Sequence, residues 1–68
     1  MIDYDYPTAT KPNLDGITTD VAASDMTNKQ LQYCEWLGQP IETLTVWFDV
    51  SLSVADKGKL DVIVENNS

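Results

Sequence analysis

The strongest constraint on the fold is an alternation of apolar and polar residues that runs without interruption from Leu44 to Val54. Every second residue is apolar, and the intervening positions hold threonine, serine, aspartate and one tryptophan. A two-residue period is typical of a β-strand with one face in the core. A second alternating segment, residues 60–65, follows Asp56-Lys57-Gly58, which suits a three-residue hairpin loop. The pattern predicts a long antiparallel β-hairpin.

The phase of the alternation predicts the register of this hairpin. A four-residue loop would set Leu52 against Asp61, because a slip of one residue reverses the faces of a strand. The three-residue loop makes apolar residues meet. The pairs that it predicts are Val54 with Leu60, Leu52 with Val62, and Val50 with Val64.

The polar face of the hairpin supplies the candidate partner-binding residues. The same register places Asp49 opposite Glu65, and directly opposed like charges destabilise a sheet. Trp47 and Ile63 flank this pair, and apolar residues with a charged rim are typical of protein-binding hot spots. The alternative is that the N-terminal arm buries Trp47 and Ile63, because one side of a tryptophan is usually covered.

A short α-helix is predicted from about Thr27 to Leu37. Its start has the form of a capping box, Thr27-Asn28-Lys29-Gln30, and Gly38 with Pro40 is typical of a helix end. A start one turn earlier, capped by Ser24, is the alternative. A helix of about ten residues is not stable alone, so we expect it to pack on the hairpin. The expected contacts are Leu31, Cys34 and Leu37 with Phe48, Val50, Leu52 and Val62.

Residues 1–24 are predicted to form an N-terminal arm with short strands. Residues 2–7 alternate between apolar and acidic side chains and close with Pro7, which confines a strand to a sheet edge. Residues 13–16 predict a turn, and the β-branched segment 17–21 predicts a second short strand.

These elements predict a single α+β domain. An N-terminal extended arm or short strand, residues 1–24, precedes a core of one short α-helix packed on a long antiparallel β-hairpin, residues 25–68. The early part of the first hairpin strand, residues 42–48, lacks a partner in this scheme. An N-terminal strand or a second subunit could supply one.

The charge of the chain narrows the class of partner. The 68 residues include eleven acidic residues and four lysines, with no arginine and no histidine, for a net charge of −7. Nucleic acids and anionic membranes are bound through lysine and arginine, so we expect the chain to bind neither directly. The acidity serves either solubility or attraction to a basic protein surface. The single cysteine and the absence of a signal-peptide pattern favour a cytoplasmic location.

The missing histidine and arginine argue against catalysis. A Ser–His or Cys–His pair cannot form within one chain, and neither can an arginine clamp for phosphate transfer. Cys34 lies on the apolar face of the predicted helix and is expected to be a small buried hydrophobe. Two carboxylate pairs, Asp3/Asp5 and Asp49/Glu65, are the only acid–base candidates, and a chain this small rarely closes a cleft around them. We expect that the protein is not an enzyme and that it binds no cofactor.

The function predicted from the sequence is a non-catalytic protein-interaction module. Its most concrete form is an inhibitor or decoy that presents carboxylates to a basic, nucleic-acid-binding protein surface. The alternative is a structural homo-oligomer whose acidity serves only solubility, because a small core often needs a partner subunit. A carboxylate calcium site in residues 13–20 is a second alternative, although it lacks the regular ligand spacing of a calcium loop.

Overall fold

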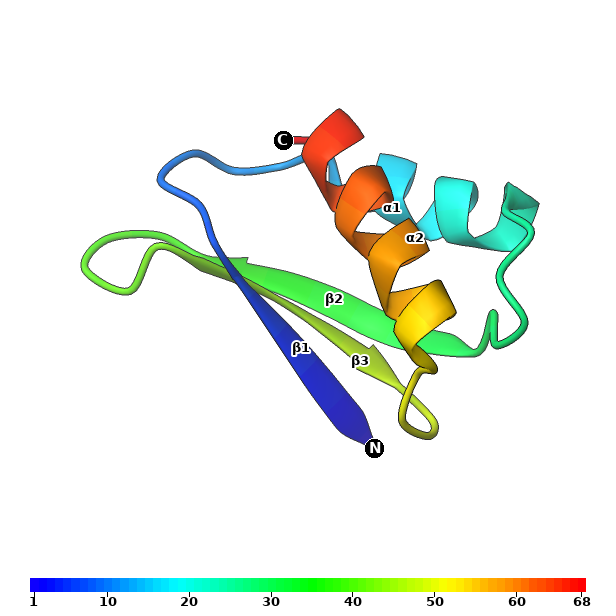
Figure 1. Cartoon of the computed structure of the whole chain (residues 1–68). Coiled ribbons are helices and arrows are strands. Elements are labelled where there is room, and N and C mark those ends of the chain that lie inside the picture. Colours follow the sequence, from blue (N-terminus) through cyan, green and yellow to red (C-terminus); the bar gives the residue numbers. More distant parts are fainter.

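The chain folds as a three-stranded antiparallel sheet with two helices, in a computed structural model that describes all 68 residues. The elements are β1 (Ile2–Pro7), α1 (Leu14–Ala23), β2 (Leu31–Leu37), β3 (Thr43–Phe48) and α2 (Val54–Asn66). The strand order is β1-β3-β2, and both helices lie over the same face of the sheet (Figure 1). The predicted α+β class is confirmed. Neither helix is long and apolar enough to cross a membrane.

The N-terminal strand is confirmed as the neighbour that residues 42–48 require. β1 pairs antiparallel with β3, from Ile2 opposite Phe48 to Pro7 opposite Thr43. β2 pairs with the other side of β3, which makes β3 the central strand. β1 and β2 are therefore the two edges of the sheet, and Pro7 closes an edge strand, where a missing amide is tolerated.

The core lies between the sheet and the helices. The even-numbered residues of β3 are fully buried, as the alternation predicts for one face of this strand. Each such side chain contributes about 1.5–3 kcal/mol relative to an exposed one. Both helices and the connection after α1 complete the cluster, which comprises Ile17, Val21, Met26, Leu44, Val46, Phe48, Leu60 and Val64.

The predicted helix over residues 27–37 is wrong, because residues 31–37 form strand β2. The pairing of β2 with β3 advances two residues on β2, from Leu31 to Tyr33, for one residue on β3. This β-bulge changes the phase of the alternation, so Leu31 and Cys34 both pack on the core although they are three residues apart. That spacing is the one an amphipathic helix would show. Gly38 and Pro40, expected to end a helix, lie in the turn between β2 and β3.

The predicted second strand of the hairpin, residues 60–65, is also wrong, because it belongs to helix α2. Strand β3 ends at Phe48 although the alternation continues to Val54, and residues 49–53 form a loop. The side chain of Ser53 then accepts a hydrogen bond from the Asp56 amide and caps α2. Leu60 and Val64 are buried one helical turn apart, whereas Val62 is exposed. The residues expected in the hairpin loop, 56–58, are helical instead.

The predicted turn at residues 13–16 and strand at 17–21 are replaced by helix α1. The Asn13 side chain accepts a hydrogen bond from the Gly16 amide at 2.9 Å and caps the helix. Ile17 and Val21, four residues apart, form its buried face. β-branched residues prefer strands only weakly, so the cap and the packing of this face decide the local structure.

Candidate functional site

The sheet face that the helices leave uncovered is the candidate functional site (Figure 1). Alternate residues of the three strands present their side chains there, because the intervening residues pack into the core. The cross-strand neighbours form three rows, which we call the open face: Asp3–Trp47–Tyr33, Asp5–Thr45–Glu35 and Pro7–Thr43–Leu37.

A stacked aromatic pair stands on the first row of the open face. The rings of Tyr33 and Trp47 lie 4.6 Å apart between centroids, with 16° between their planes. Tyr33 is 49% exposed and Trp47 is half-buried. A pair of this kind contributes about 0.5–1.5 kcal/mol beyond its burial. The pair joins β2 to β3 and leaves about half of the Tyr33 surface in contact with solvent.

Three exposed carboxylates border this aromatic pair. Asp3 is the cross-strand neighbour of Trp47, and Asp5 and Glu35 flank Thr45 in the adjacent row. Asp5 accepts a hydrogen bond from the Thr45 hydroxyl at 2.9 Å. The two ion pairs of the chain involve lysines of α2, and no lysine belongs to a strand. The charge of the open face is therefore wholly negative.

The structure places the four predicted partner-binding residues on different sides of the molecule. Trp47 lies half-buried on the open face, and β1 pairs beside it within the sheet. Asp49 follows β3 directly and accepts a hydrogen bond from the Asn28 side chain at 3.0 Å. Ile63 and Glu65 belong to α2, in the helical layer behind the sheet.

The predicted cross-strand pair of Asp49 and Glu65 does not form, because residues 60–65 are helical. Ile63 is half-buried and packs against the core, and Glu65 is exposed on α2. The combination of an aromatic residue with nearby acids still occurs around Trp47, with different acids. The binding role of all four residues stays a prediction.

Sequence reasoning does not assign Asp3, Asp5, Tyr33 and Glu35 to partner binding, and it names Asp3 and Asp5 only as an acid–base candidate. A sequence signal for Asp3 and Asp5 exists, because they alternate with Tyr4 and Tyr6 along the strand predicted over residues 2–7. Tyrosines that face the core leave both aspartates on the face that carries Trp47. No such signal exists for the two residues of β2, because the bulge hides their strand character.

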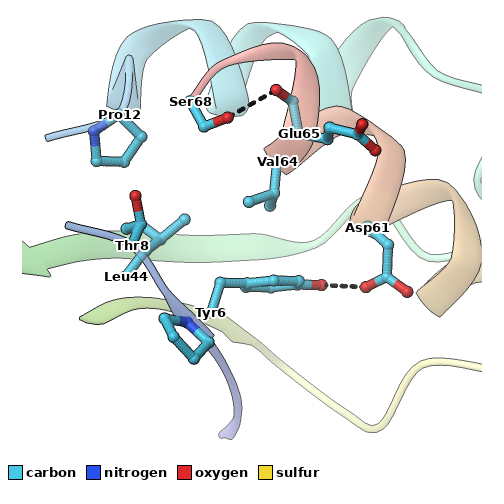
Figure 2. Close-up of a pocket in the computed structure, with 9 residues that line it drawn as sticks. Tyr6, Thr8, Pro12, Leu44, Asp61, Val64, Glu65 and Ser68 are labelled. Atoms are coloured by element: carbon cyan, nitrogen blue, oxygen red, sulfur yellow. Dashed lines mark hydrogen bonds between the residues drawn. The ribbon is translucent and has the colours of Figure 1, made fainter. Parts of the chain in front are cut away.

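A pocket of about 300 Å³ opens on the helical side, between the end of β1 and α2 (Figure 2). The Tyr6 hydroxyl in the pocket lining donates a hydrogen bond to Asp61 at 2.6 Å, and the Lys57 ammonium, which is not part of the lining, donates to the same carboxylate at 2.5 Å. The bonds from Lys57 and Tyr6 lower the pKa of Asp61. Burial, and then the bond and charge of Asp61, raise the pKa of Tyr6. The Tyr6 hydroxyl and the Asp61 carboxylate are thus engaged with each other.

The other side chains that could react or bind a metal also make structural contacts. The Cys34 thiol faces the Leu14 carbonyl oxygen at 3.8 Å, and burial raises its pKa, which disfavours the nucleophilic thiolate. Within the stretch considered for calcium, Asn13 caps α1 and Asp20 accepts a hydrogen bond from Asn67. No group of three or more acidic, cysteine or histidine side chains is placed to hold a metal ion.

Comparison of the chain with protein-family models, curated proteins and solved structures found no match. The chemistry of the open face is therefore the basis for a functional assignment. It combines an exposed aromatic surface, a rigid three-stranded support and a border of uncompensated carboxylates. An arrangement of this kind can bind a cationic and partly apolar surface.

Proposed function

We propose that the protein is a binding module whose open face docks on a basic surface of a protein partner. The observation that carries this proposal is the stacked pair of exposed Tyr33 and half-buried Trp47, which lies beside three carboxylates that have no lysine partner. Aromatic residues at the centre of a charged rim are the usual source of binding energy in protein interfaces.

The charge of the face supports a basic partner. Phosphate groups and anionic lipids would be repelled by Asp3, Asp5 and Glu35, whereas lysine and arginine side chains would be attracted. The rest of the chain reinforces the effect, because its net charge is −7. Complementary charge of this kind speeds association and selects the partner more than it adds affinity.

The most specific form of the proposal concerns the kind of basic surface. A surface that normally binds nucleic acid carries clustered lysine and arginine for contact with phosphates. The carboxylates of the open face would meet those groups in place of phosphates. The module would then act stoichiometrically, as an inhibitor or decoy.

The proposal is tested by capture experiments with the full chain from a lysate of the native host. Three forms are compared: the wild type, Trp47→Ala combined with Asp3→Lys, and Asp15→Lys as a control of similar charge on α1. We expect a basic protein to bind the wild type and the control. The double variant should bind it at least tenfold more weakly, and added salt should release it from the wild type.

Two results would contradict the proposal. One is a captured protein that the double variant retains as well as the wild type does. The other is a captured protein that is acidic or that stays bound when salt is raised. Circular dichroism of each variant establishes that loss of binding does not reflect loss of folding.

A further inference from the structure

Trp47 lies between two cross-strand neighbours, Tyr33 on β2 and Asp3 on β1. Tyr33 covers the ring face on the β2 side, at a centroid separation of 4.6 Å. The opposite ring face is therefore turned toward β1, where Asp3 is the cross-strand neighbour. Cross-strand neighbours have Cβ atoms about 4.5–5.5 Å apart, and aspartate is much shorter than tryptophan. We call the space between this ring face and the Asp3 carboxylate the notch.

The carboxylate in this notch has no partner within the chain. The two ion pairs use Asp61 and Asp25, and neither lies on the open face. Asp5, the next acid of β1 on this face, is held by the Thr45 hydroxyl, and Glu35 is exposed across the sheet. Asp3 is exposed as well. It can accept hydrogen bonds from a ligand without giving up an internal contact.

We propose that this notch selects arginine over lysine in the basic partner. A guanidinium group is planar, so it stacks on an aromatic ring while its N–H groups donate two parallel hydrogen bonds to one carboxylate. A lysine ammonium is compact and strongly hydrated, and it cannot satisfy both surfaces in this way. The partner chemistry is thus an arginine-bearing protein segment, with the guanidinium between the free ring face of Trp47 and Asp3. This inference rests on the proposed function and names the side chain that the open face would bind.

The experiment titrates the full chain with two peptides of equal length and charge, an arginine hexamer and a lysine hexamer. Binding is followed by NMR through the backbone amide signals and the two indole N–H signals. Trp36 serves as an internal reference, because its indole N–H donates to the Thr8 carbonyl oxygen at 3.1 Å on the core side of the sheet. We expect the arginine peptide to shift the Trp47 signal selectively and to bind about tenfold more tightly, a difference of about 1.4 kcal/mol.

Matched variants assign the preference to the notch. Asp3→Asn should reduce the affinity for the arginine peptide toward that for the lysine peptide, because the amide offers only one acceptor. Asp15→Asn removes the same charge from α1 and should leave the preference unchanged. A preference that survives Asp3→Asn would overturn the assignment.

The remaining outcomes separate this inference from the proposed function. Equal binding of both peptides at the Trp47 signal would overturn arginine selection and leave a basic-surface module intact. Shifts spread over the acidic residues of both helices, without a response of Trp47, would overturn both. Absence of binding by either peptide at low salt would also overturn both the arginine selection and the proposed function.

Discussion

At the scale of single residues, Asp56 joins two segments that local sequence does not connect. Its carboxylate accepts hydrogen bonds from the backbone amides of Thr27 and Asn28, each at 2.9 Å. These amides lie in the connection between α1 and β2, whereas Asp56 lies in the first turn of α2. Asp56 is buried, and the two amide bonds lower the pKa of its carboxyl group. A carboxylate expected in a hairpin loop is thus a tertiary tether.

Asp56 makes the stability of the protein sensitive to acid. Its native pKa is lowered, so its contribution is complete above the ordinary aspartate pKa of about 3.9. The contribution is lost as the pH falls through the lowered native value. We expect the urea midpoint of the wild type to decrease below about pH 4. Asp56→Asn should lower the midpoint at pH 7 and flatten this decrease, because the side-chain amide turns a donor toward a backbone N–H.

The control for this prediction is Asp3→Asn, which removes an exposed carboxylate. Its urea midpoint should match that of the wild type at pH 7 and below about pH 4. Asp61, whose pKa is also lowered, leaves a residual acid dependence in Asp56→Asn. If the urea midpoint of Asp56→Asn fell with pH as steeply as that of the wild type, the Asp56 hydrogen bonds would not be an important part of the acid response.

At the scale of elements, the two helices meet at a close contact between Gly16 of α1 and Asn67 at the end of α2. A Cβ atom on Gly16 would lie 2.1 Å from Asn67 Oδ1 and 2.7 Å from Asn13 Nδ2. The Asn67 side chain cannot move freely, because its amide donates to Asp20 at 2.9 Å and to the Ile63 carbonyl oxygen at 2.8 Å. The backbone N–H of Asn13 also donates a hydrogen bond to the Asn67 carbonyl oxygen at 2.7 Å.

The glycines in the two helices should therefore respond oppositely to alanine. Gly58 of α2 has nothing within 4 Å of an added Cβ, so Gly58→Ala should stabilise the fold by about 0.5–1 kcal/mol through helix propensity. Gly16→Ala gains the same propensity and loses the contact with Asn67, with a net destabilisation of about 1 kcal/mol or more. Thermal unfolding of the two variants checks the signs, and stabilisation by Gly16→Ala would refute the close contact.

The elements also show where sequence reasoning succeeds and fails. Strand β3 and its buried face are predictable, because the alternation is long and its apolar phase packs on the core. Strand β1 is predictable for the same reason. Helix α2 is not, because Leu60 and Val64 share one face in a strand and in a helix alike. Within the segment, the exposure of Val62 separates the two, and exposure is a tertiary property.

At the scale of the whole molecule, the open face and the two sheet edges decide whether copies associate. A symmetric dimer through the open face would bring Asp3, Asp5 and Glu35 close to their own copies. The edge strands carry the devices that natural sheets use against pairing, namely charged residues and Pro7 on β1 and a bulge on β2. These features disfavour self-association.

We expect the protein to be a monomer at micromolar concentration, by light scattering at low salt. The combined variant Asp3→Asn, Glu35→Gln neutralises part of the face and leaves the Tyr33–Trp47 pair in place. Its tendency to associate should be greater than that of the wild type. A wild-type dimer that persists at micromolar concentration would favour the structural homo-oligomer over the binding module.

The sequence by itself determined the central strand, the N-terminal strand, the acidic charge and the lack of histidine and arginine, because each depends on composition or on a long local period. The tertiary structure alone decided the states of residues 31–37 and 54–66. In the first segment a bulge imitates helical spacing, and in the second a four-residue repeat fits both states. The open face depends on that decision, since Tyr33 and Glu35 reach it only when β2 pairs with β3.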